Sequence, residues 1–152
     1  MTDYALLIKQ LKSLAGEEPY YVPLMANASA LLRQALPDIN WAGFYIVRGG
    51  ALVLGPFQGK PACIRIEPGR GVCGTAVSRD RIQRVPDVHK FPGHIACDCA
   101  SNSEIVVPIH AGGVPAAVLD IDSPVLNRFT QEDEAGLAEF AKVIEDCVSF
   151  SD

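Results

Sequence analysis

The chain has 152 residues, of which 49% are hydrophobic and 20% charged, and its formal net charge is -5. This composition indicates a single globular domain over residues 1–152 rather than a disordered chain, and the acidic balance disfavours a nucleic-acid partner. The N-terminus shows no secretory pattern and no apolar run approaches the roughly 20 residues of a membrane span, so we expect a cytoplasmic protein without a membrane partner.

The N-terminal region has the pattern of two helices. Apolar residues recur at helical spacing over residues 7–14 and again over residues 24–35, where Pro23 suits the first turn of a helix. Pro37 is expected to end the second helix, because its ring would clash with the preceding turn.

Two glycine pairs mark the turns of predicted hairpins. Gly49 and Gly50 separate β-prone runs at residues 41–47 and 51–57, and Gly112 and Gly113 separate runs at residues 104–109 and 114–121. Glycine adopts the positive φ values of tight turns, and the prolines in these runs are expected at edges or bulges. One more short strand is predicted at residues 63–66, whereas the basic segment 79–84 is interpreted as solvated surface.

The remaining segments predict two helices and a long loop. A short helix is expected over residues 71–80, and residues 87–103 contain too many Gly, Pro, His, Asp and Ser for regular structure. Such a long loop within a domain is usually functional. A last helix begins near Gln131, capped by Thr130 with Asp133, and its apolar stripe includes Cys147 as a small core residue.

Together these elements predict an α+β fold. Helices at both ends with antiparallel hairpins between them do not give the alternation of a parallel sheet. We expect an antiparallel sheet of about six strands with the N- and C-terminal helices packed on one face and the long loop over the other.

The cysteines are the first sign of chemistry. Four of the five, Cys63, Cys73, Cys97 and Cys99, fall within one 37-residue stretch, and the last two lie in a polar, loop-like segment after His94. Thiols in such a loop are exposed and can ionise, unlike a structural cysteine inside an apolar run. In a reducing compartment, redox use or metal binding explains them better than a disulfide framework.

Aromatic residues on the first strand predict one wall of a pocket. Trp41, Gly43 and Tyr45 share a face of this strand, since side chains alternate with period two. The two aromatic rings equally suit a plain core position. The glycine between them is interpreted as leaving room for a ligand.

Three acids are expected on the other hairpin. Asp120 and Asp122 share a face at the end of an apolar strand, and Glu104 opens its partner strand, so the three can converge. Clustered carboxylates repel one another unless a cation or a shared proton offsets the cost, although a solvated strand end is the alternative.

These residues together suit a small ammonium-bearing ligand attacked by a thiolate. The glycine-rich residues 68–74 precede a helix and could receive a carboxylate on backbone N–H groups. A zinc site from Cys63, His94, Cys97 and Cys99 is the competing use, but no Cys-x-x-Cys pair is present, so we predict no metal.

The motifs resemble a known family, the free methionine-(R)-sulfoxide reductases, which are catalytic GAF domains. The similarity runs from about Leu24 to Phe140 and is carried by these segments: Asn40-Trp41-Ala42-Gly43-Phe44-Tyr45, Leu54-Gly55-Pro56-Phe57-Gln58-Gly59-Lys60, Gly69-Arg70-Gly71-Val72-Cys73-Gly74-Thr75-Ala76, Gly93-His94-Ile95-Ala96-Cys97-Asp98, Ser101-Asn102-Ser103-Glu104-Ile105-Val106 and Leu119-Asp120-Ile121-Asp122-Ser123. The cysteine-bearing motifs make the resemblance specific, because GAF folds alone are mostly binding modules.

The resemblance implies a role for each cysteine. It makes Cys97 the nucleophile and Cys63 the thiol that resolves the intermediate as a disulfide, with Cys73 as a third thiol of lesser role. Cys99 departs from the pattern, since the family commonly has a small non-thiol residue there, and it offers a second resolving thiol.

The resemblance also implies the substrate site and the partners. Trp41 and Tyr45 would cradle the substrate methyl group, and Glu104, Asp120 and Asp122 would surround its ammonium group and sulfoxide oxygen. Free methionine sulfoxide is the implied substrate, thioredoxin or a similar dithiol the reductant, and no bound cofactor is expected. Homodimer formation is left open. A non-catalytic GAF sensor of a small molecule or of redox state is the alternative function.

Overall fold

The computed structural model describes residues 1–94 and 100–151. Its helices are α1 (Tyr4–Ala15), α2 (Tyr21–Ala35), α3 (Gly71–Arg79), the 3₁₀ turn η1 (Val88–Lys90) and α4 (Gln131–Cys147). Its strands are β1 (Trp41–Arg48), β2 (Ala51–Gly59), β3 (Arg65–Ile66), β4 (Gln83–Val85), β5 (Ser103–Ala111) and β6 (Val114–Ser123). The predicted α+β class is confirmed.

The strands form one antiparallel sheet of six strands in the order β3-β2-β1-β6-β5-β4. Both predicted hairpins are present, and the glycine pairs at their turns have φ of 58° and 81° in one and 60° and 81° in the other. Pro108 lies in β5 beyond the stretch that pairs with β4, where no N–H is needed on that edge.

The two short edge strands differ from what the sequence predicted: β4 was missed, and β3 is shorter than expected. The first two residues of the edge strand β4 belong to segment 79–84, which we had interpreted only as solvated basic surface. A strand of three residues is too short to show an alternation of apolar and polar side chains. The strand predicted at residues 63–66 is shorter, because Cys63 and Ile64 precede β3 rather than belong to it.

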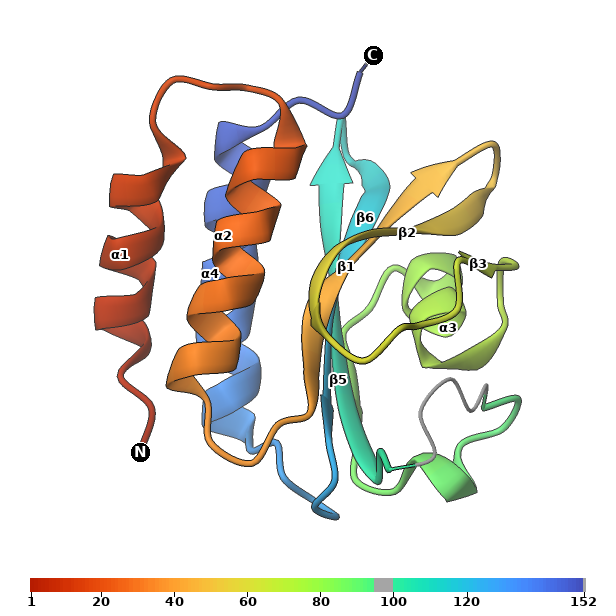
Figure 1. Ribbon diagram of the computed structural model, residues 1–152. Coiled ribbons are helices and arrows are strands. Elements are labelled where there is room, and N and C mark those ends of the chain that lie inside the picture. The colour runs from red at the N-terminus through yellow and green to blue at the C-terminus, as the bar shows by residue number, and fades with distance from the viewer. Residues whose placement is uncertain (95–99, 152) are drawn as a thin grey trace.

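Helices α2 and α4 cover one face of the sheet and α1 packs on their outer side, so the terminal helices lie on one face as predicted (Figure 1). Asp3 caps α1 by accepting from the Leu6 amide at 3.0 Å, and Thr130 and Asp133 form the predicted capping box of α4. The buried side chains between helices and sheet form one core, to which the strands contribute mainly Ala42, Phe44, Ile46, Ile105, Val107, Ile109, Leu119 and Ile121.

The opposite face of the sheet carries α3 and part of the long loop (Figure 1). Val88 and Phe91, from the described part of that loop, pack in a second apolar cluster with residues of α3 and of β1. The loop is therefore placed as predicted as far as it is described, although η1 gives it one turn of regular structure.

Cys147 was wrongly assigned to the core. It is exposed at the last residue of α4, and the next residue of the stripe, Val148, is only partly buried. The core closes one turn earlier, at Ile144.

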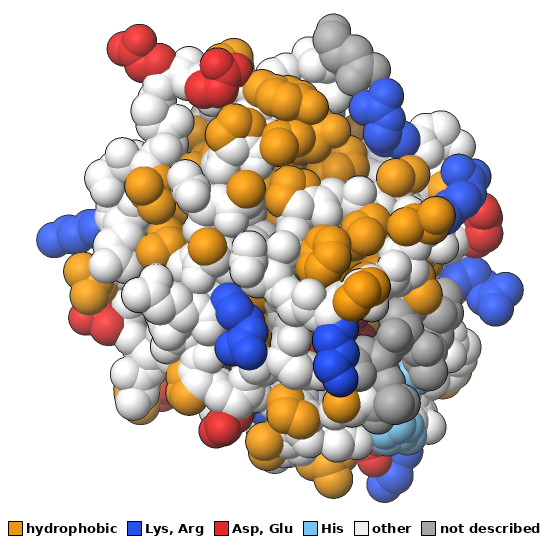
Figure 2. Space-filling model, in the orientation of Figure 1, with side chains coloured by type: hydrophobic (Ala, Val, Ile, Leu, Met, Phe, Trp, Pro, Cys, Tyr) orange, Lys and Arg blue, Asp and Glu red, His pale blue; other side chains and the backbone are white. Residues whose placement is uncertain are grey.

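No helix among the described residues is long and apolar enough to cross a membrane. On the face shown in Figure 2, lysine and arginine side chains stand apart from one another among apolar and uncharged side chains.

Candidate active site

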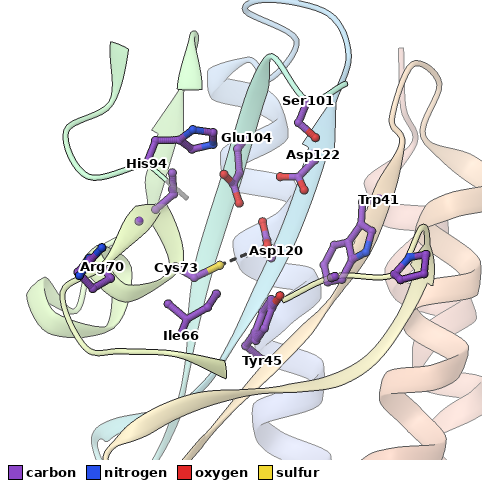
Figure 3. A pocket seen from close by; sticks show the side chains of 14 residues that line it. Trp41, Tyr45, Ile66, Arg70, Cys73, His94, Ser101, Glu104, Asp120 and Asp122 are labelled. Atoms are coloured by element: carbon purple, nitrogen blue, oxygen red, sulfur yellow. Dashed lines mark hydrogen bonds between the residues drawn. The ribbon is translucent and has the colours of Figure 1, made fainter. Parts of the chain in front are cut away.

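The register of three strands builds the floor of a pocket. Trp41 of β1 pairs with Asp122 of β6, and Asp122 pairs in turn with Glu104 of β5, so the three lie in one row across the sheet. In the next row Gly43 pairs with Asp120. Period-two alternation turns all of these toward the face that carries α3. The predicted convergence of the three acids is confirmed (Figure 3).

The pocket above this floor has an empty volume of about 580 Å³ when the open solvent at its mouth is included. Its walls come from β1, from the segment that precedes α3, from α3 itself and from the described ends of the long loop. The lining residues are Trp41, Tyr45, Pro61, Ala62, Ile66, Arg70, Gly71, Val72, Cys73, His94, Ser101, Glu104, Asp120 and Asp122.

Trp41 and Tyr45 form the predicted aromatic wall. Their rings lie with centroids 6.1 Å apart and planes inclined by 24°, and both residues are almost fully buried. Burial first, and then the negative charge of Asp120, raises the pKa of Tyr45. The phenol therefore stays a neutral hydrogen-bond donor.

The interpretation of Gly43 was wrong. A Cβ at this position would lie 2.3 Å from the Cβ of Phe57 and 2.9 Å from the Pro56 carbonyl oxygen. The absent side chain thus makes room for β2 at a register shift between Gly43 and Tyr45, not for a ligand. Phe57 uses that closeness to stack on Trp41, with ring centroids 5.2 Å apart.

The acids are buried and share protons. Burial, followed by the charges of Asp120 and Asp122, raises the pKa of Glu104 well above its usual range. Burial also raises the pKa of Asp120, against hydrogen bonds from Glu104, Cys73 and Asp122 that act in the opposite direction. Among these acids Glu104 therefore has the strongest tendency to keep a proton, with Asp120 as its hydrogen-bond acceptor. Asp120 Oδ1 is buried without a hydrogen-bond partner among the described residues.

The segment before β3 is tied to the aromatic wall. Tyr45 donates its hydroxyl to the Cys63 carbonyl oxygen at 2.8 Å, and Trp41 Nε1 donates to the Lys60 carbonyl oxygen at 3.1 Å. These two bonds hold Cys63 at the rim of the pocket, next to the lining residue Ala62. Cys63 is disulfide-bonded, whereas Cys73 and Cys147 are free thiols.

The first turn of α3 and the long loop close the other side. Arg70, Gly71 and Cys73 line the pocket at the start of α3, although the Gly71 amide donates to the Gly93 carbonyl oxygen at 3.1 Å and is not free for an anion. His94 lines the wall, and burial with the nearby His89 lowers its pKa. Cys97 and Cys99 lie outside the described residues.

Sequence reasoning missed Ser101 as a pocket residue. Ser101 is 6% exposed and accepts a hydrogen bond from Asn40 Nδ2 at 3.2 Å, which joins the segment before β5 to the start of β1. The available signals were its place three residues before Glu104 and its presence in a segment that carries the family resemblance.

The metal site considered from the sequence cannot be assembled from described residues, since it needs Cys97 and Cys99. A different group, Cys73, Glu104 and Asp120, has ligand atoms within 4.8 Å of one another. The same residues equally suit an ammonium group. Asp120 Oδ2 accepts from Cys73, whereas Asp120 Oδ1 is buried without a hydrogen-bond partner among the described residues, and a bound ammonium group could donate to it.

Comparison with known proteins agrees with this architecture. The family model described as GAF domain matches residues 19–148. Protein YtsP of Bacillus subtilis is 57% identical over 145 residues, which cover 94% of this chain and 89% of that protein. Free methionine-R-sulfoxide reductase of Escherichia coli is 54% identical over 149 residues, covering 98% and 90%. The structure of fRMsr of Staphylococcus aureus in complex with substrate superposes with a TM-score of 0.93 at 50% identity, covering 98% of this chain and 97% of that one.

The fold, the site and the matched residues define a GAF domain, and the chain belongs to that family. Identity above half over almost its whole length places it, within that family, among the free methionine-R-sulfoxide reductases.

Proposed function

We propose that this protein reduces free methionine-R-sulfoxide to methionine by thiol chemistry. The observation that carries the proposal is the row of Trp41, Asp122 and Glu104 on the floor of one pocket, with Asp120 beside it. The substrate is a zwitterion whose other end carries a polar sulfoxide oxygen and an apolar methyl group. Buried carboxylates suit its ammonium group, and the stacked faces of Trp41 and Tyr45 suit its methyl group.

The first chemical step uses Cys97. Its thiolate attacks the sulfoxide sulfur, and Glu104 or Asp122 gives a proton to the oxygen as the S–O bond breaks. The attack forms a bond between the Cys97 sulfur and the substrate sulfur. As that bond and the S–O bond break, the hydroxyl passes to the Cys97 sulfur as a sulfenic acid and methionine leaves. The raised pKa of Glu104 supports its part, because a proton donor must hold a proton near neutral pH.

The second step regenerates the enzyme. The Cys63 thiol condenses with the sulfenic acid, water leaves and an intramolecular disulfide forms; thioredoxin or a similar dithiol then reduces it by exchange. The anchoring of Cys63 at the pocket rim and its disulfide-bonded state support this role over one for Cys73, which is a buried free thiol. Cys99 is the second candidate for the resolving thiol. A thioredoxin-dependent enzyme of this kind acts in the cytoplasm.

Selectivity for the free amino acid follows from the same pocket. A site that buries the substrate ammonium group among carboxylates leaves no path for a polypeptide chain to continue from that nitrogen. The protein should therefore reduce free methionine sulfoxide and not a sulfoxide within a peptide.

The direct test is turnover of free methionine-R-sulfoxide with a dithiol reductant, measured as methionine released. The protein should turn over many times, and Cys97→Ser should lose nearly all activity, because a serine alkoxide is scarcely populated near neutral pH. Cys147→Ser, at an exposed thiol far along α4, is the matched control and should keep wild-type rates. A sensor domain would instead oxidise once and release no methionine beyond that event.

The resolving step is tested separately with Cys63→Ser. This variant should release about one methionine per enzyme and then stall with thioredoxin, because the sulfenic acid forms but is not resolved. Full turnover by Cys63→Ser, followed by stalling only in the Cys63/Cys99 double variant, would assign the resolving role to Cys99.

A further inference from the structure

Cys73 is a buried thiol that the proposed chemistry does not use. It lies in the first turn of α3, is 4% exposed, and lines the pocket opposite Asp120 (Figure 3). Its Sγ donates a hydrogen bond to Asp120 Oδ2 at 3.2 Å, across 47 positions of the sequence. This bond joins the helix over the pocket to the strand that carries the acids.

The surroundings of Cys73 keep it a thiol. Burial first, and then the charges of Asp120 and Glu104, raises the pKa of the Cys73 thiol well above its usual value. The thiolate is the nucleophilic and redox-active form, so Cys73 is a poor participant in thiol exchange. The same proton makes it a lasting donor to Asp120.

Because of this bond, the two carboxylate oxygens of Asp120 differ in their hydrogen-bond partners. Oδ2 accepts from Cys73, whereas Oδ1 is buried without a hydrogen-bond partner among the described residues. Glu104 also hydrogen-bonds to this carboxylate. Asp120 is thus held by Cys73 from α3 and by the neighbouring acids Glu104 and Asp122 of the sheet.

We propose that Cys73 is a positioning residue, not a redox thiol, and that its S–H orients the Asp120 carboxylate for the substrate ammonium group. This inference rests on the proposed function. A neutral donor does so without adding a positive charge that would repel the ammonium. The positioning role also explains why a cysteine occupies a place where its surroundings suppress thiol reactivity.

The test compares Cys73→Ala with Cys73→Ser, and Cys147→Ala serves as the matched control. Cys73→Ala loses the donor, so KM for free methionine sulfoxide should rise about tenfold or more while kcat changes little, the size expected for a hydrogen bond to a charged group. Because that bond lowers the pKa of Asp120, its loss should move the acidic limb of kcat/KM to higher pH. Cys73→Ser keeps a donor on a shorter bond and should restore much of both properties.

Two measurements keep the outcome clear. Alkylation of enzyme quenched during turnover should find Cys73 fully reduced at every stage, and calorimetric binding of free methionine should show the same loss in Cys73→Ala without any chemistry. Equal stalling of both variants after one turnover, or a Cys73 that resists alkylation after the quenched enzyme is denatured, would make it a redox thiol and overturn the inference. Wild-type KM, pH profile and methionine binding in Cys73→Ala would overturn it too. Failure of the wild-type protein to turn over would count against the proposed function alone, because methionine binding still tests the positioning role.

Discussion

The two faces of the central sheet are built from the same strands but differ in what they bury. On the helical face, β6 contributes Leu119 and Ile121 to a core between the sheet and α1, α2 and α4. On the other face, the alternate residues Asp120 and Asp122 lie in the pocket under α3. A shift of one position along a strand thus separates a residue that stabilises the fold from one that costs stability.

The difference has an electrostatic consequence. Apolar burial on the helical face is favourable at every pH, whereas the raised pKa of Glu104 means that its ionised form is disfavoured in the folded protein. The unfolded chain ionises this group from about pH 4.3, so the stability that protonated Glu104 provides declines as pH rises from there through the folded-state pKa. Substitutions on the two faces should therefore have opposite effects on stability and activity.

The largest effect on stability is expected on the helical face. Phe140 of α4 is fully buried in that core. Phe140→Ala should lower the free energy of unfolding by about 3–5 kcal/mol, because it removes apolar contacts and leaves a cavity. Denaturant unfolding measures the loss, and KM of the variant that remains folded should match the wild type. A loss below about 1 kcal/mol would mean that this core is not packed as described.

Glu104→Gln should give the opposite pattern on the pocket face. We expect a rate of sulfoxide reduction about 100-fold lower, the size typical of a lost general acid, with unchanged or higher thermal stability at neutral pH. The stability advantage over the wild type should grow as pH rises above about 4.3, because only the wild-type side chain can ionise on unfolding. Wild-type kinetics in this variant, and in Asp120→Asn and Asp122→Asn, would show that the acids only border the site.

Gly43→Ala tests the close approach of β1 and β2. A Cβ there meets Phe57 Cβ at 2.3 Å and Phe57 Cα at 2.8 Å, and the second of these is backbone that cannot rotate away. We expect a loss of about 1–3 kcal/mol from overpacking, measured by denaturant unfolding. Wild-type stability of Gly43→Ala would mean that β2 moves aside easily. In that case the variant should lose the stacking of Phe57 on Trp41.

Much of the fold followed from periodicity alone. The helices of one face, the two hairpins and the cap at Thr130 are local features whose residues specify them over a few positions. β4 was missed because three residues at a sheet edge acquire their conformation from pairing with β5. Cys147 was misplaced because the extent of a core depends on where the helix passes its neighbours, not on the stripe itself.

The site was predictable where it depends on alternation and not where it depends on distant contacts. The acids and the aromatic pair share a face by period two, so their convergence followed once the hairpins were assigned. Glycine is needed at position 43 because of a register shift between β1 and β2, and the hydrogen bond from Cys73 to Asp120 joins residues 47 positions apart. Neither contact leaves a local pattern in the sequence.

The smallest expected effect concerns His110, which follows the bulge in β5 and links the two faces. Its Nε2 lies 2.6 Å from Asp80 Oδ1, at the end of α3, and its Nδ1 lies 3.0 Å from Glu145 Oε1, on α4. Lys142 and Arg81 also border this position, and Lys142 pairs with Glu145 at 2.9 Å. The hydrogen bond to Asp80, followed by that to Glu145, raises the pKa of His110 despite partial burial.

A histidine with a raised folded-state pKa stabilises the fold fully below its unfolded pKa of about 6.5 and loses that contribution as pH rises through the folded value. His110→Gln should therefore cost more stability near pH 5.5 than near pH 8.5. The difference should stay below about 1 kcal/mol, because one-third of the side chain is exposed and its charges are screened. Denaturant unfolding at the two pH values measures it, and Asp80→Asn should remove part of the pH dependence while leaving methionine binding unchanged. An equal cost at both pH values would show that the imidazole bridges α3 and α4 as a neutral hydrogen-bonding group, and that charge has no part in joining the two faces.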